Sequence, residues 1–215
     1  MDVHDALTQI ADIRQQVARA QTFKGYRAFT TAFTGVVAIV TASLQSVLLP
    51  EPHHSPERYG NEWSLLSEQF RLDYYLYLWC AAAVISIVVV GSEMFIRVRR
   101  SGSSLQRDLT LAAVEQFVPS LVAGLFLTIV LAQFAIESVW MLPGLWMILF
   151  AMGVYSSRRV LPRFSHIVGG FYLLAGLLIL GLNRQAGLHA WTMGTIFGVG
   201  QMMAAGLLWY VERKS

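Results

Sequence analysis

The stretch YYLYLWCAAAVISIVVVGSEMFI, residues 74–96, runs directly into RVRR at residues 97–100. An apolar segment of this length is enough for one helix to cross a bilayer, whose hydrocarbon core takes about 20 residues. Arginines that follow such a segment favour the cytoplasmic side of the membrane. The sequence therefore predicts a transmembrane helix here, with its C-terminal end in the cytoplasm.

Five further apolar runs extend this pattern in both directions. They are Tyr26–Leu49, Ala112–Ile136, Val139–Tyr155, Phe164–Leu182 and Ala190–Val211. Every second gap between the runs is basic, so 13 of the 16 Lys and Arg residues fall on one side, leaving only Arg58, Arg71 and Arg184 on the other. This asymmetry is typical of the positive-inside rule. We predict an all-α, polytopic membrane bundle of six transmembrane helices, with the N and C termini both cytoplasmic.

The composition supports a membrane protein and excludes several other classes. The chain is 55% hydrophobic and 13% charged, whereas soluble domains contain about 25% charged residues. The net charge of +3 lies in short loops, where it meets anionic lipid headgroups, so we expect a lipid bilayer and no nucleic acid as partner. Cys80 is the single cysteine, which excludes an intrachain disulfide.

Two segments lie outside the predicted spans. Residues 1–25 have apolar positions at helical spacing, such as Val3, Leu7 and Ile10, which predicts a cytoplasmic amphipathic helix. Such a helix lies on the inner leaflet or docks a partner. Residues 26–215 form the predicted transmembrane domain, with residues 50–73 as its one sizeable external loop.

The later helices contain similar segments. Ser120–Leu127 resembles His166–Leu173, and Ile148–Gly153 resembles Thr195–Gly200, at offsets of 46 and 47 residues. If these similarities reflect an internal repeat, the fold consists of three hairpins in parallel orientation about an axis along the membrane normal. Chance similarity between apolar helices that contain glycine explains the pattern equally well.

Small and polar residues form stripes along several runs. The last run aligns Gly194, Gly198 and Gln201, and amides lie on corresponding stripes of the third and first runs at Gln133 and Gln45. In membranes, small residues allow helices to approach closely, and amides form hydrogen bonds across the contact. We interpret these five residues as a helix-packing and polar stripe.

Three ionisable residues form the candidate intramembrane polar site. Glu93, Glu115 and His166 each lie about one turn from the predicted cytoplasmic end of a different helix. Two carboxylates and an imidazole at one depth can hold a proton or a cation. The alternative is that each side chain reaches the headgroups or pairs with a loop arginine. We predict neither a catalytic residue nor a dedicated metal site.

The known catalytic signatures, including phosphate-binding loops, His-Glu-x-x-His, Gly-x-Ser-x-Gly and Cys-x-x-Cys, do not occur in the sequence. His166 and His189 fall at opposite faces of the predicted bilayer, which excludes a haem bound by both. The sequence thus indicates no particular cofactor, and an enzyme is the least expected class. We predict a small oligomeric transporter or channel; the alternative is a non-catalytic accessory, sensory or scaffolding subunit of a membrane complex.

Three segments carry a resemblance to known proteins. Ile10–Gln16, Thr22–Gly25 and Gly194–Gln201 resemble segments of small six-helix bacterial membrane proteins that have no assigned function. The resemblance implies a bacterial inner membrane as the location. It implies nothing about activity or ligands. The partners we expect are a second copy of the chain or another membrane subunit.

Overall fold

The computed structural model describes residues 28–49, 61–101, 104–159, 161, 164–182 and 188–214. Every regular element in these ranges is a helix. The α-helices are α2 (Ala28–Leu48), α3 (Asn61–Ser101), α4 (Ser104–Phe134), α5 (Leu142–Ser156), α6 (Ser165–Gly181) and α8 (Ala190–Lys214), and the 3-10 helices are η1 (Ile136–Met141) and η2 (Ser157–Arg159). The predicted amphipathic helix at residues 1–25 lies outside the described residues.

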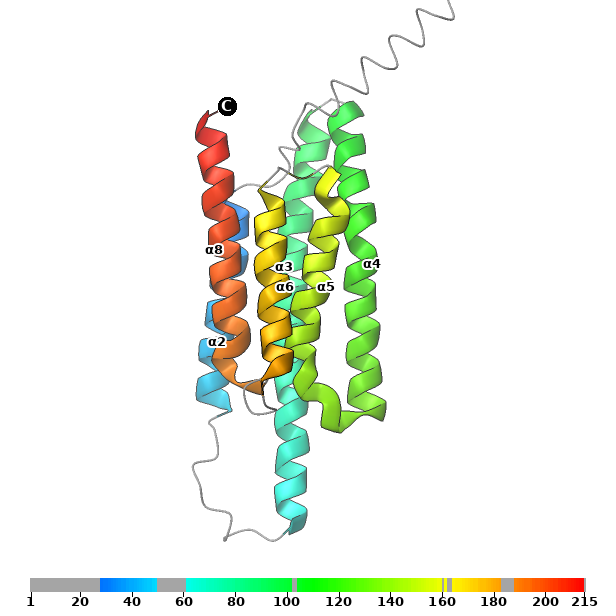
Figure 1. Ribbon diagram of the computed structural model, residues 1–215, viewed down its shortest axis with the longest axis vertical. Coiled ribbons are helices and arrows are strands. Elements are labelled where there is room, and N and C mark those ends of the chain that lie inside the picture. Colours follow the sequence, from blue (N-terminus) through cyan, green and yellow to red (C-terminus); the bar gives the residue numbers. More distant parts are fainter. Residues whose placement is uncertain are drawn as a thin grey trace, which may run out of the picture.

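The long helices lie side by side and alternate in direction (Figure 1). We call the end of the bundle at which α8 finishes the C-terminal end. α2 and α4 start at this end and run away from it, and α3 and α5 return to it. Consecutive apolar runs therefore cross the bundle in opposite directions, as a multi-pass membrane protein requires.

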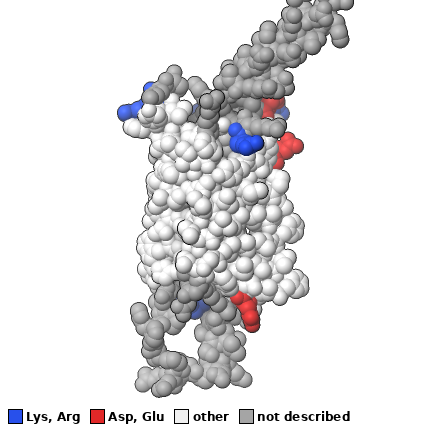
Figure 2. Space-filling model, viewed as in Figure 1, with Lys and Arg blue, Asp and Glu red and all other residues white. Residues whose placement is uncertain are grey.

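The dimensions of the helices suit a bilayer. Among the described residues, five segments are long and apolar enough to span a membrane: Ala28–Leu48, Phe70–Arg100, Thr110–Phe134, Ile136–Ser156 and Ala190–Val211. The sixth predicted run forms α6, which has 17 residues and extends about 25 Å at 1.5 Å per residue, close to the lower limit for a span. Figure 2 shows a broad uncharged band on one face, with charged side chains near its two ends.

The external segment predicted at residues 50–73 is partly helical, and its residues 50–60 lie outside the described residues. Residues 61–73 are helical and form the first turns of α3, which has 41 residues in total. Figure 1 shows this part of α3 projecting beyond the other helices at the end opposite the C-terminal end. Hydropathy detects only the apolar part of a helix, so a polar extension into water is easily read as a loop.

The helices form a closed ring in chain order. Each of them contacts the next, and α8 contacts α2, with the most extensive packing between α2 and α8 and between α5 and α6. Glycines allow both of these contacts. A methyl group on Gly35 would lie 3.2 Å from the carbonyl oxygen of Gly198, and one on Gly144 would lie 2.9 Å from that of Gly176. The backbones are therefore close enough for van der Waals packing to hold these pairs together.

The connection between α4 and α5 is short. α4 ends at Phe134, η1 makes the connection, and Pro143 lies in the first turn of α5. A proline costs little there because the first backbone N–H groups of a helix have no intrahelical acceptor.

The three-hairpin repeat stays a prediction.

Aromatic side chains fill the space between α5, α6 and α8. Tyr172 is fully buried, and its ring centroid lies 4.7 Å from that of Phe150 and 5.2 Å from that of Phe197. Phe150 also meets Phe117 of α4 edge-to-face, with the ring centroids 5.5 Å apart. Close-packed rings of this kind fill the space between these helices at the level of Tyr172.

Candidate functional site

A polar network crosses the bundle at Gln201 of α8. The Thr34 hydroxyl of α2 shares its proton between the carbonyl oxygen of Thr31 at 2.8 Å and Gln201 Oε1 at 3.2 Å. Gln201 Nε2 donates to the Tyr172 hydroxyl of α6 at 3.3 Å. That hydroxyl in turn donates to the carbonyl oxygen of Phe197 at 3.4 Å. The network joins three helices, and each of these side chains has a hydrogen-bond partner. The network therefore holds the three helices together.

A second polar junction lies toward the opposite end, around Gln45 of α2. Trp79 Nε1 of α3 donates to Gln45 Oε1 at 2.7 Å, and Gln45 Nε2 donates to the carbonyl oxygen of Leu188, just before α8, at 3.1 Å. Gln45 is buried. Periodicity alone places Gln45 on a polar stripe, but it cannot identify Trp79 as its partner.

The remaining members of the predicted stripe divide into two groups. Gly194 and Gly198 pack against Ala42 and Ile39 of α2. Gln133, in contrast, is exposed on α4 rather than packed between described helices. The reason is geometric: spacing shows which residues share a helix face, but it does not show which face points inward.

The three ionisable candidates lie on three different helices. Glu93 is half-buried on α3, whereas Glu115 of α4 and His166 of α6 are exposed. Among the described residues, no group of three or more His, Cys, Asp or Glu side chains is arranged to hold a metal ion. Pro119, four residues after Glu115, cannot donate to the Glu115 carbonyl, which opens the helical ladder there. The convergence of the three side chains stays a prediction.

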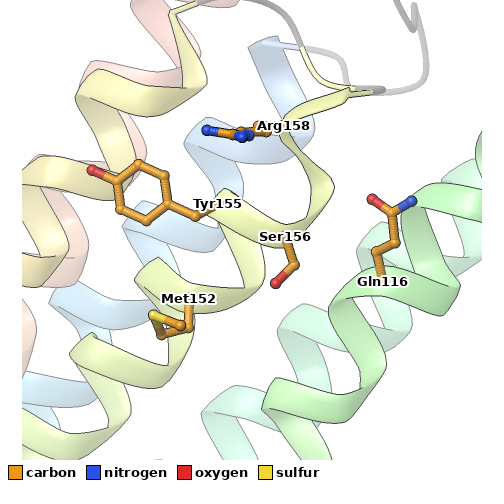
Figure 3. A pocket seen from close by; sticks show the side chains of 5 residues that line it. All are labelled: Gln116, Met152, Tyr155, Ser156 and Arg158. Atoms are coloured by element: carbon orange, nitrogen blue, oxygen red, sulfur yellow. The ribbon is translucent and has the colours of Figure 1, made fainter.

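A pocket lies at the C-terminal end of the bundle. It has a volume of about 590 Å³ and is lined by Gln116 of α4, Met152, Tyr155 and Ser156 of α5, and Arg158 of η2. We call it the α4–α5 cleft. Figure 3 shows Gln116 reaching from α4 toward α5, with Tyr155 and Arg158 extending to the other side of α5. Met152, Ser156 and Arg158 are exposed, so the cleft opens to the outside of the bundle.

Hydrogen bonds fix the walls of the cleft. The Tyr155 hydroxyl donates to the carbonyl oxygen of His166 at 3.3 Å, which ties α5 to α6. The buried Ser157 hydroxyl donates to the carbonyl oxygen of Ala113 at 3.3 Å, which ties η2 to α4. Gln116 Oε1 is buried and has no hydrogen-bond partner. The cleft thus combines an exposed cation, hydroxyl groups and one unsatisfied acceptor.

The sequence contains only weak signals of this cleft. Gln116 adjoins the candidate Glu115, and Arg158 belongs to a basic loop that indicates topology. Tyr155 resembles an ordinary interfacial aromatic residue. Only the packing of α4 against α5 brings these side chains to one place.

Comparison with known proteins identifies no relative. No protein-family model, no curated protein and no solved structure matches the chain.

Proposed function

We propose that this chain is an integral membrane protein that acts as a non-catalytic accessory or scaffolding subunit, and that its α4 helix binds another membrane-spanning chain. The observation that carries the proposal is the exposure of α4. Only 11% of its most apolar stretch is buried, against 44% for the stretch that includes α5. A large part of this helix therefore faces whatever surrounds the chain.

Lipid suits the apolar part of this surface, but polar side chains share it. Glu115 and Gln133 are both exposed, and they lie eighteen residues, or five full helical turns, apart on one face of α4. Phe126 lies between them on the same face and is 61% exposed. Carboxylates and amides in membrane helices usually face protein or water, because unsatisfied polar groups are costly in hydrocarbon. A second chain along this face would supply their partners.

The location belongs to the same proposal. The basic gaps between the apolar runs favour a cytoplasmic C-terminal end of the bundle. The resemblance to small bacterial membrane proteins favours the inner membrane. Both termini are then cytoplasmic.

Transport is the second candidate, and the same face favours it. Aromatic rings fill the interior between α5, α6 and α8, so a pathway would run between copies of the chain rather than through one copy. Glu115 and Gln133 would line that pathway. A small oligomeric transporter or channel is consistent with this arrangement.

Photocrosslinking tests the subunit proposal. p-Benzoylphenylalanine replaces Phe126 on α4, and in a control it replaces Leu178 on α6, which is 69% exposed. We expect ultraviolet light to give a larger protein species in native membranes from the Phe126 position alone. A product of twice the chain's mass identifies a second copy, and any other mass identifies a different subunit. Crosslinks to lipid only, from both positions, would contradict the proposal.

Flux measurements separate the two candidates. Purified protein is placed in liposomes with a potassium gradient and a pH-sensitive dye, and empty liposomes serve as the baseline. A subunit without transport activity gives the baseline proton flux. A transporter gives a higher flux that Glu115→Gln lowers while the Phe126 crosslink persists.

A further inference from the structure

The lining of the α4–α5 cleft changes character along the membrane normal. Met152, Tyr155 and Ser156 follow one another at helical spacing on one face of α5, and Arg158 lies beyond the end of that helix. Met152 is 50% exposed and lies deepest toward the middle of the bundle. The cleft is therefore apolar on its membrane side and cationic at its outer end. A phospholipid has the same order of groups, from acyl chain to headgroup.

The cation suits a phosphate group. Arg158 is exposed, and none of the other four lining residues is charged. A guanidinium group donates two parallel hydrogen bonds to a phosphate, in the strong charge-assisted class. Basic pockets between membrane helices on the cytoplasmic side bind anionic headgroups for this reason.

The side-chain amide of Gln116 places a second requirement on the ligand. Gln116 Oε1 is a buried acceptor without a hydrogen-bond partner, and leaving such an atom unsatisfied is costly. Figure 3 shows this oxygen on the side of Gln116 that faces α5. A ligand that completes the cleft therefore offers a donor to Gln116 besides a phosphate to Arg158. A headgroup hydroxyl supplies this donor without adding a positive charge near Arg158.

We propose that the α4–α5 cleft binds an anionic phospholipid whose headgroup carries a free hydroxyl, as in phosphatidylglycerol. Arg158 binds the phosphodiester, the Gln116 side chain turns into the cleft so that its buried Oε1 accepts a hydrogen bond from the headgroup hydroxyl, and Met152 contacts the acyl chain. This assignment does not depend on the proposed function, because the cleft and the exposed Glu115 face of α4 are tested by different variants.

Native mass spectrometry in detergent micelles provides the test. Wild-type protein is titrated with phosphatidylglycerol, with phosphatidylmethanol and with phosphatidylcholine. Phosphatidylmethanol has the same single negative charge but lacks a headgroup hydroxyl, and phosphatidylcholine has no net charge. We expect phosphatidylglycerol to bind about fivefold more tightly than phosphatidylmethanol, the ratio for one neutral hydrogen bond of about 1 kcal/mol. Phosphatidylcholine should bind more weakly than both.

Two variants assign the contacts, and a third is the control. Arg158→Gln should weaken binding of both anionic lipids by about tenfold, as expected for a hydrogen bond to a charged group. Gln116→Met, which keeps the length of the side chain, should remove the preference for phosphatidylglycerol over phosphatidylmethanol. Arg107→Gln alters an exposed arginine of α4 outside the cleft and should change the affinities by less than about twofold. Arg158 is exposed, so its replacement should leave the fold intact.

Several outcomes would overturn the assignment. Equal losses from Arg107→Gln and Arg158→Gln would show general attraction to a basic loop rather than a site. An unchanged lipid preference in Gln116→Met would remove the hydroxyl contact. Displacement of the lipid by equimolar glycerol 1-phosphate would show that the site takes a free phosphate compound and not a membrane lipid.

Discussion

The indole nitrogen of Trp79 donates a 2.7 Å hydrogen bond to Oε1 of Gln45, so that one buried amide connects α2 to α3. The other end of the same amide donates to the carbonyl oxygen of Leu188 at 3.1 Å. Gln45 is buried, so water does not replace either partner when the amide is removed.

Replacing Gln45 with Leu should therefore destabilise the protein. The substitution leaves the Trp79 N–H and the Leu188 carbonyl unsatisfied, at a cost of about 1–3 kcal/mol. Thermal unfolding in mild detergent measures the loss. Gln133→Leu is the matched control, because that amide is exposed on α4, and its Tm should stay the same or rise. An equal fall in Tm for both variants would show that the Gln45 contacts are not the cause.

Replacing Gly198 with Leu should disrupt the contact between α2 and α8. A methyl group at Gly198 would already lie 2.8 Å from Cγ1 of Ile39, and overpacking of this kind costs about 1–3 kcal/mol. Gly206→Leu on the same helix is the control, since nothing lies within 4 Å of its added carbon. We expect a lower Tm for the Gly198 variant alone. Equal Tm values for the Gly198 and Gly206 variants would show that the close contact between α2 and α8 does not stabilise the protein.

Two buried tyrosines should respond oppositely to the loss of their hydroxyl groups. The Tyr172 hydroxyl accepts from Gln201 and donates to the Phe197 carbonyl, so Tyr172→Phe should lower the free energy of unfolding by about 1 kcal/mol. The Tyr75 hydroxyl is buried without a hydrogen-bond partner, so Tyr75→Phe should be neutral or stabilising. Chemical denaturation of both variants checks the difference. A larger loss of unfolding free energy for Tyr75→Phe than for Tyr172→Phe would contradict the hydrogen bonding assigned to the two hydroxyl groups.

The orientation in the membrane can be tested with two cysteines that flank one helix. Asp108 is exposed near the start of α4, and Glu137 is exposed just after its end. In a Cys80→Ser background, an impermeant maleimide should label Glu137→Cys on intact cells, and it should label Asp108→Cys only after the cells are permeabilised. The reverse pattern would place the C-terminal end of the bundle outside.

Hydropathy predicts where the helices of this chain lie but not how they are arranged. The six apolar runs all correspond to helices in the described residues, because a bilayer requires long apolar segments. The polar start of α3 is missed, since Glu62, Glu68 and Arg71 lower the hydropathy without preventing a helix.

The interior is less predictable for a related reason. A stripe such as Glu115 and Gln133 can face either the bundle or its surroundings, and only the neighbouring helices decide this. The α4–α5 cleft likewise depends on Gln116 and Arg158 lining one pocket from two different elements. Sequence spacing does not show that these two elements lie next to each other.

The closure of the ring by α2 and α8 has a consequence for synthesis. α2 is the first of the described helices to leave the ribosome, and α8 is the last. Until α8 has been synthesised, the Gly35 face of α2 lacks the helix against which it packs most closely. The bundle can therefore close only after α8 has been made. A ribosome that stalls before α8 leaves an open ring in the membrane, and quality-control proteases would meet it in that state.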